Sequence, residues 1–540
     1  MTRPSLAVAT RPSAWQARWR VRAAVLALAA LSMAHVGSPN TFFGGKAGPY
    51  DVRVTVRLPG VIPGRAQVTV RVAGVADSAS HQVTVRAGQW NVGLEGAPPP
   101  EAAAPVPGDA SLYSSELWFM TPSSYQLAVA IDGPAGHGAV IIPVLALATA
   151  ERPMPSWLGA ALAALGVFLT VGLLTIVGSA VRESGLPPGA QPDARRRVRA
   201  RFGIAIAGLL AALALWGGNR WWAAEASSYS RSVLYRPFDA VASIAQDARR
   251  VLTLSIRDER WNGTPNPRSR YNALLPDHGK LMHLFLVRDE GLDALAHLHP
   301  IPRSAAGLDF DVDVPRLPAG RYRVYGDIVH ESGYAQTLVS SVDLADGSAD
   351  NARPEPVDQP PRSALRRSAV ASAKAEGRAQ DPDDSWFSGA SAPEAATVAY
   401  DLGNDTRLVW TRGESPIVAG VERDLRFSVQ DAAGADVAVE PYMGMAAHVV
   451  VASRDGAVFA HLHPSGSVSM AAMERFAGAT GADAHTGHAM TLDGRVAVPY
   501  AFPTAGPYRL FVQVKRAGKV LTSAFDVDVK PATFSALRAS

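Results

Sequence analysis

Segments in which apolar and polar residues alternate recur along the chain, and they predict β-strands. A period of two places successive side chains on opposite faces of a half-buried strand. In the first part of the chain five segments share this pattern: residues 50–57, 66–73, 81–86, 115–120 and 125–132. Pro-Gly pairs separate the first of them, which is typical of turns. Residues 138–147 add an apolar strand. We therefore expect residues 38–155 to form a small antiparallel β-sandwich with a Pro/Ala-rich loop at 97–108.

Three continuous apolar runs interrupt the strand pattern. Residues 23–34 follow a basic segment and have the length of a signal-peptide core, so residues 1–37 are expected to be a signal peptide or an uncleaved signal anchor. Residues 156–181 carry no charge and are long enough to cross a membrane. Residues 202–218 are shorter, but Trp216 and two following tryptophans fit an aromatic belt at a membrane surface. The pattern predicts two or three transmembrane helices.

The distribution of arginine predicts the orientation of these spans. Residues 182–201 hold six arginines against two acidic residues, so the positive-inside rule predicts a cytoplasmic loop. That orientation places residues 38–155 and the whole chain beyond the second span on the opposite side. Little lysine beside abundant alanine and arginine is typical of a GC-rich bacterial genome. We therefore expect a bacterial inner-membrane protein whose β-modules lie in the periplasm.

Two segments in the second half of the chain are repeats of one another. Residues 280–300 (KLMHLFLVRDEGLDALAHLHP) and 444–464 (GMAAHVVVASRDGAVFAHLHP) share a His, an apolar strand, a turn, a second strand and Ala-His-Leu-His-Pro. Further along, residues 317–325 (LPAGRYRVY) match residues 503–511 (PTAGPYRLF). A similarity of this extent indicates duplication of a β-module.

The duplication sets the expected organisation of the outer part. The fold class is mainly β, with three β-sandwich modules in addition to the transmembrane helices. After the second span we expect a membrane-proximal connector at 219–248, a β-module at 249–344, a mobile linker at 345–395, a further β-module at 396–530 and a tail at 531–540. The linker is rich in Ala, Ser, Pro, Asp and Arg and shows no apolar period.

Alternating histidines in both repeats are candidate metal ligands. Residues i and i+2 of a strand point to the same face, so His297 projects together with His299, and the same holds in the other repeat. An antiparallel hairpin brings the upstream His close to such a pair. Three imidazoles suit copper, which has the highest affinity in the divalent series, and zinc less so. The candidate ligands are His283, His297, His299, His448, His461 and His463. The alternative is that these histidines are hydrogen-bonding parts of a duplicated fold.

Further candidate ligands surround the second repeat. Residues 483–490 (DAHTGHAM) resemble the short His/Met segments of bacterial copper-handling proteins, and thioethers favour Cu(I). The secondary ligands predicted here are Met445, His485, His488 and Met490. The first repeat offers Asp277, His278 and His330 as weaker candidates. The alternative is a flexible loop with scattered polar residues.

Composition excludes several other functions. The chain has no cysteine, which removes disulfides, iron–sulfur clusters, cysteine zinc sites and the blue-copper site. The net charge of +4 arises from arginines beside apolar runs, so nucleic-acid binding is not expected. The motifs of a phosphate-binding loop, a zinc protease and a serine hydrolase are not found. We therefore do not expect an enzyme.

Part of the chain resembles exported bacterial β-sandwich domains. Residues 277–283 (DHGKLMH), together with 296–300 (AHLHP), resemble a segment of envelope proteins associated with copper and other heavy metals. The first module, with ELWFM at 116–120, resembles the YtkA-like and FixH-like domains. The resemblance implies immunoglobulin-like or CopC-like sandwiches that bind or deliver metal, with metal-handling envelope proteins as partners. Two departures are the spans inserted between modules and the lack of His/Met ligands in the first module.

The pattern as a whole predicts a membrane-anchored periplasmic protein that binds metal, copper first, for buffering, delivery or resistance. The competing hypothesis is a structural or adaptor envelope protein that binds a protein partner through its β-sandwiches and holds no metal.

Overall fold

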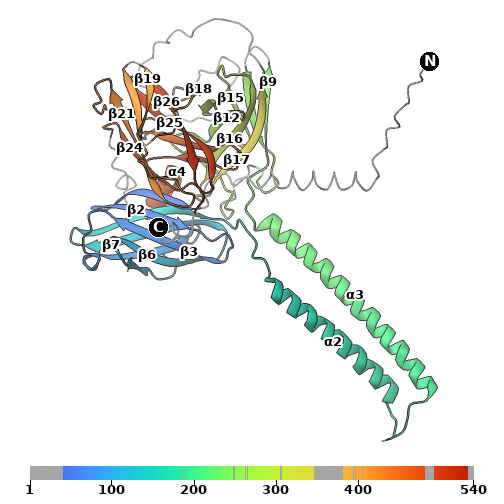
Figure 1. The fold of residues 1–540 in the computed structure, drawn as a ribbon. Helices are drawn as coiled ribbons and strands as arrows, with labels where there is room; N and C mark the ends of the chain where they lie inside the picture. The colour runs from blue at the N-terminus through green and yellow to red at the C-terminus, as the bar shows by residue number, and fades with distance from the viewer. Residues whose placement is uncertain are drawn as a thin grey trace, which may run out of the picture. The chain divides into compact units, whose positions relative to one another are not determined.

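The computed structural model describes residues 40–532 of the chain and is mainly β (Figure 1). Within this range it leaves out residues 188, 247–249, 262, 264–265, 305–306, 346–380, 393, 396, 404 and 481–491. The chain divides into two compact units. One comprises Met1–Leu58, Arg65–Ala146 and Pro237–Ser540, and the other comprises Pro59–Gly64 and Leu147–Arg236. The expected signal segment, His485, His488 and Met490 lie outside the described residues.

The smaller unit contains two long helices, α2 (Ser156–Glu183) and α3 (Ala194–Ser232). Both are long and apolar enough to cross a membrane. Helix α3 begins inside the expected Arg-rich loop and continues past the expected end of the span at 218. Its start follows from local chemistry, because the Asp193 side chain accepts a hydrogen bond from the Arg196 amide as an N-cap. Arginine and alanine are also strong helix formers, so the basic segment joins the helix.

Eight antiparallel strands build the first module. They are β1 (Thr41–Ala47), β2 (Tyr50–Arg57), β3 (Gly64–Val72), β4 (Gln82–Gln89), β5 (Glu101–Val106), β6 (Asp109–Phe119), β7 (Ser123–Gly133) and β8 (Gly136–Ala146). A short 3-10 turn, η1 (Ser78–Ser80), precedes β4. Hydrogen bonds join the strands into one sheet in the order β1-β2-β3-β6-β5-β4-β7-β8. The expected loop at 97–108 is wrong in part, because the Ala-rich stretch forms β5 between β4 and β6.

The second module consists of two sheets around one core. Its strands are β9 (Ala240–Gln246), β10 (Arg250–Ile256), β11 (Leu274–Leu275), β12 (His283–Arg288), β13 (Ala294–Leu298), β14 (Ile301–Pro302), β15 (Asp309–Asp313), β16 (Gly320–His330), β17 (Ala335–Leu344) and β18 (Ser385–Ser388). One sheet has the order β14-β15-β10-β9, and the other β11-β16-β12-β13-β18 with β17 on β16. Strand β9 lies in the expected connector and β18 in the expected linker. Both join the module because each pairs along its length with a neighbouring strand.

The third module repeats this plan. It contains β19 (Thr397–Gly403), β20 (Thr406–Thr411), β21 (Arg423–Asp431), β22 (His448–Ser453), β23 (Phe459–Leu462), α4 (Met470–Thr480), β24 (Arg495–Tyr500), β25 (Gly506–Arg516) and β26 (Lys519–Val529). Its sheets are β19-β20-β21-β24 and β23-β22-β25-β26. After Pro464 the chain forms α4, in which Met470 and Met473 are buried.

The two repeats pack against each other through equivalent sheets. Along β12, Leu284 and Leu286 face the core of their own module, whereas Phe285 and Val287 contact the other repeat. The same apolar cluster includes Phe459 and other residues of β22, β23 and β25. This two-sided burial explains why these strands are apolar on both faces rather than alternating. The candidate histidines lie at this interface between the repeats.

Candidate metal centre

Side chains alternate between the two faces of a strand, and in both repeats the candidate histidines lie on the face that contacts the other repeat. His283 begins β12 two residues before Phe285, so its side chain shares the face that contacts the other repeat. His297 on β13 stacks on Phe285 with ring centroids 4.2 Å apart. His448 and His461 occupy the equivalent places on β22 and β23. Five of the six predicted histidines are buried, and the side chain of the sixth, His461, is 7% exposed.

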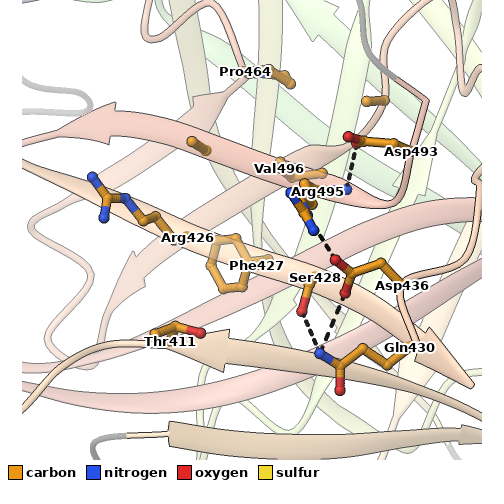
Figure 2. A pocket seen from close by; sticks show the side chains of 12 residues that line it. Thr411, Arg426, Phe427, Ser428, Gln430, Asp436, Pro464, Asp493, Arg495 and Val496 are labelled. Carbon is orange, nitrogen blue, oxygen red and sulfur yellow. Dashed lines mark hydrogen bonds and ion pairs between the residues drawn. The ribbon is translucent and has the colours of Figure 1, made fainter. Parts of the chain in front are cut away.

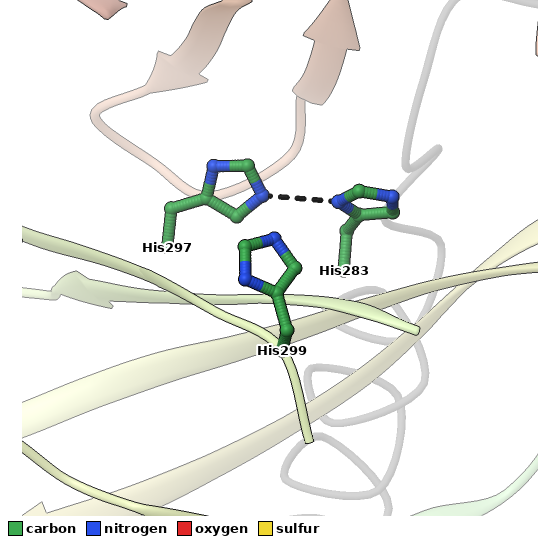
Figure 3. A group of neighbouring side chains, drawn as sticks. All are labelled: His283, His297 and His299. Atoms are coloured by element: carbon green, nitrogen blue, oxygen red, sulfur yellow. Dashed lines mark hydrogen bonds between the residues drawn. The ribbon is translucent and has the colours of Figure 1, made fainter. Parts of the chain in front are cut away.

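Each repeat brings its three histidines together, and Figure 3 shows those of the first repeat. In both triads one nitrogen from each ring lies within 4.8 Å of the other two. The triads are His283, His297, His299 and His448, His461, His463. Imidazole nitrogens bound to one tetrahedral metal at roughly 2.0–2.1 Å are about 3.3 Å apart. The nearest nitrogens of the two triads are 3.1 Å and 2.9 Å apart, so the rings already have the spacing of ligands.

A backbone carbonyl fixes the upstream histidine of each triad. His283 Nε2 lies 3.2 Å from the Asp277 carbonyl oxygen, and His448 Nε2 lies 3.1 Å from the Tyr442 carbonyl oxygen. Because a carbonyl oxygen only accepts hydrogen bonds, Nε2 is the protonated nitrogen of each ring. The lone pair of Nδ1 therefore points into the triad. Metal-binding histidines are usually oriented in this way by a bond from the second nitrogen.

The middle histidine of each triad is fixed by the other repeat. His297 Nδ1 lies 3.0 Å from Gln513 Oε1 on β25, and His461 Nδ1 lies 3.4 Å from Asp327 Oδ2 on β16. The amide nitrogen of Gln513 donates to the Ser385 hydroxyl at 2.7 Å, which leaves its oxygen for His297. The first triad therefore depends on an acceptor that the second repeat supplies, and a carboxylate of the first repeat lies close to the second triad.

The third histidine of the first triad has a carboxylate partner. His299 Nδ1 lies 2.9 Å from Asp384 Oδ1, a residue just before β18 in the expected linker. The same carboxylate oxygen accepts the His299 amide at 2.9 Å. His299, Asp381 and Asp384 also form a group of possible metal ligands of their own. With Asp384 on Nδ1, the free nitrogen of His299 is Nε2, which has no hydrogen-bond partner among the described residues.

These tautomers leave two lone pairs opposed in the first triad. Nδ1 of His283 and Nε2 of His297 are 3.1 Å apart, and the other nitrogen of each ring already donates. Such a pair is repulsive unless a cation lies between or beside the nitrogens. A proton is disfavoured, because burial lowers the pKa of His283 to about 4 and holds that of His297 well below its usual value. A bound metal ion satisfies both nitrogens.

The other predicted residues differ in their relation to the cluster. His278 joins it, with its ring centroid 5.3 Å from that of His463. His330 does not, because it lies among aromatic rings at the end of β16, and Nδ1 contacts the Asn272 carbonyl oxygen at 2.7 Å. Met445 is buried in the turn before β22, where its backbone bonds with Tyr442. Asp277 bonds with the Ala471 amide at the start of α4, which fixes its carboxylate.

Sequence reasoning missed the partners that orient the rings. Asp327 and Gln513 follow the matched segments 317–325 and 503–511 by two residues and occupy equivalent positions. Asp327 pairs with His283 across the strands, and Gln513 pairs with His448. Extending the repeat alignment by two residues therefore gives the signal that finds them. No comparable signal marks Asp384, because its segment has no counterpart in the aligned repeats.

A separate pocket lies on the third module, with a volume of about 680 Å³ (Figure 2). Strands β20, β21 and β24 contribute much of its wall. Its charged groups have partners, since Arg495 contacts Asp436 at 2.6 Å, the Arg495 amide bonds with Asp493, and Arg426 contacts Asp424 at 3.1 Å. Pro464, which follows His463, also lines it. The pocket brings together no histidine and no opposed lone pairs, so the interface cluster is the stronger candidate.

Comparison with known proteins identifies the repeats without assigning a function. A model of a domain of unknown function, DUF8832, matches residues 240–344 and 403–531, which are nearly the second and third modules. No curated protein matches the chain.

Solved structures resemble the chain only distantly. They include dimeric latent PorU from Porphyromonas gingivalis (10% identity, 92% of this chain and 34% of that chain, TM-score 0.13). Another is the native conformation of E. coli alpha-2-macroglobulin (9% identity, 92% of this chain and 23% of that chain covered, TM-score 0.18). The chain therefore spans about a third and a quarter of these two proteins.

Proposed function

We propose that this protein is a membrane-anchored metal-binding protein whose resident ions, copper first and zinc second, lie between the two repeats. The observation that carries the proposal is the first triad, in which two histidine nitrogens oppose their lone pairs at 3.1 Å while every outer nitrogen has an acceptor. This arrangement suits a bound cation, because metal-binding histidines are usually oriented by a hydrogen bond from the ring nitrogen that does not bind the metal.

Burial of the cluster favours retention of metal over its transfer. His297 and His448 are 0% exposed, and His299 is 4% exposed. An ion bound by these rings is covered by the packed repeats, out of reach of the side chains of a partner protein. Of buffering, delivery and resistance, the geometry therefore supports firm sequestration of an ion best, whether it serves resistance or forms a permanent centre.

The setting we propose is a bacterial inner membrane, with α2 and α3 as spans and the β-modules in the periplasm. The two apolar helices and the arginines between them support this orientation. An oxidising compartment also suits a copper protein that has no cysteine. The resemblance to YtkA-like, FixH-like and CopC-like domains remains a prediction.

Metal titration of the full chain in lipid nanodiscs tests the proposal. Cu(I), Cu(II) and Zn(II) are each titrated into the metal-free protein, and bound metal is counted after gel filtration. The test variant carries His297→Gln and His461→Gln, and the matched control carries His137→Ala, an exposed histidine of the first module. Circular dichroism verifies that each variant retains its β-structure.

We expect tight binding of one or two ions by the wild type and the control, and its loss in the double variant. Equal binding by all three proteins would assign the histidines to the scaffold. A wild type that binds none of the three ions would favour the adaptor hypothesis, and the search would turn to protein partners.

A further inference from the structure

A seventh imidazole, His278, lies at the boundary between the two triads. It belongs to the first repeat, in the turn before β12. Its ring centroid is 5.3 Å from that of His463 and 5.6 Å from that of His448, both in the second repeat. The distance to His283 of its own repeat is longer, at 6.1 Å. Within the second triad the ring centroids are 4.6 to 5.2 Å apart, so His278 lies almost as close to His448 and His463 as the members of the triad lie to each other.

The backbone holds His278 in an unusual conformation. The Asp277 and Lys280 backbones exchange two hydrogen bonds of 2.8 and 2.9 Å, which closes a two-residue turn. At its centre His278 has φ +51° and Gly279 has φ +80°. The left-handed region is unfavourable for a residue that has a side chain. The turn nonetheless carries a histidine whose side chain is only 8% exposed.

One ring nitrogen of this region lacks a partner. His278 Nε2 is buried and has no hydrogen-bond partner among the described residues. Buried polar atoms of native proteins are nearly always paired, so this unpaired imidazole nitrogen points to a missing ligand. The Asp277 carboxylate oxygen, 3.8 Å from His278 Nε2, adds negative charge that favours a cation here.

The second repeat builds the same turn without a histidine. Tyr442 and Met445 exchange hydrogen bonds of 2.8 and 3.0 Å, and Met443 and Gly444 have φ +49° and +79°. Met443 therefore occupies the place that His278 has in the first repeat, five residues before the upstream histidine. Both repeats therefore have the turn, but only the first repeat has a histidine in it.

We propose that His278 crosses the repeat interface as a fourth ligand for the ion held by His448, His461 and His463. This inference rests on the proposed metal-binding function and makes the two sites of the centre different. The second site is a closed set of four imidazoles, the arrangement that retains a structural ion. The first site has three imidazoles and a position open to a further ligand, as in catalytic metal sites.

The experiment uses the full chain in nanodiscs, titrated with Cu(II) and followed by EPR. The test variant is His278→Asn, because asparagine tolerates the left-handed region and the turn should fold. The matched control is Met443→Asn at the equivalent turn of the other repeat. Azide is added at saturating copper as a probe of open coordination positions.

For the wild type we expect two EPR species, of which azide perturbs one. In His278→Asn both species should respond to azide, and the affinity of one site should fall at least tenfold, the lower limit seen when even an outer partner of a ligand is lost. The control should keep the wild-type pattern of affinities. If His278→Asn matches the wild type in affinity and azide response while His463→Gln loses one site, His278 is not a ligand. A wild type that binds no copper would instead overturn the proposed function.

Discussion

Acid should destabilise this protein through His330, a buried histidine that the metal cluster does not use. Its side chain is 0% exposed, Nδ1 donates to the Asn272 carbonyl oxygen, and the Trp261 ring lies edge-on 5.2 Å away. Burial lowers the pKa of His330 to about 4, against 6.5 for an exposed histidine. Between these values the unfolded chain binds the proton and the folded chain does not. The stability from this residue is therefore complete above pH 6.5 and falls as the pH decreases toward 4.

The size of the effect follows from the two pKa values. A difference of about 2.5 pKa units corresponds to roughly 3.4 kcal/mol over the whole window, of which about 2.5 kcal/mol is lost by pH 4.5. For a cooperative unit of 150–250 residues, 1 kcal/mol shifts the melting temperature by about 2–4 °C. We therefore expect His330 to lower the melting temperature at pH 4.5 by about 5–10 °C.

The assay compares wild type with His330→Gln, which keeps a hydrogen-bonding group but does not titrate. Thermal unfolding of the metal-free full chain is recorded from pH 7.5 to 4.5, and the difference between the two proteins is taken at each pH. Other titrating groups, the cluster included, cancel in this difference. We expect the difference to be constant above pH 6.5 and to shift in favour of the variant below it. Parallel curves down to pH 4.5 would refute the reasoning, because they would mean that His330 takes up its proton without unfolding.

Three further predictions concern the assembly of the centre. Gly466→Ala should weaken packing of the first module on the loop after His463, because the new Cβ would lie 2.1 Å from the Phe42 carbonyl oxygen. Calorimetry should show a loss of about 2–3 kcal/mol in the free energy of unfolding from the hydrogen bonds broken there. The control Gly478→Ala, in open space on α4, should show no such loss. Gln513→Leu should lower metal affinity about 10- to 100-fold by releasing a ring, and isothermal titration measures it. A strong chelator should remove the bound ion far more slowly than it captures free metal, and release as fast as from an exposed His-tag would contradict a buried site.

Much of the fold could be predicted because its signals are local. Strand alternation located β2, β3 and β7, and uncharged apolar length located α2. The repeat pattern also paired the correct histidines, since a hairpin of two adjacent strands needs no knowledge of distant contacts. His283 on β12 and His297 on β13 come together for this reason. The boundaries of α3 were less predictable, because the basic segment before the span is compatible with either a loop or a helix.

The features of the fold that the sequence did not predict depend on contacts between distant segments. Strand β18 has four residues in a stretch rich in Ser and Asp, and only its pairing with β13 makes it a strand. Helix α4 follows a segment with no regular apolar period, and its start is fixed by Asp277, which lies almost two hundred residues earlier. The burial of both faces of β12 needs the second repeat. None of these features has a signature within its own sequence window.

The same dependence explains why the chain needs two copies of the module. Taken alone, the first repeat provides three histidines but not the acceptor for His297, which is Gln513 of the second. The second repeat likewise lacks Asp327 of the first, whose carboxylate lies 3.4 Å from His461 Nδ1. Without these neighbours the middle rings lose contacts that orient them. Packing of the repeats therefore assembles the proposed metal centre, and an ion bound there should in turn stabilise that packing, because it would bind only the assembled form.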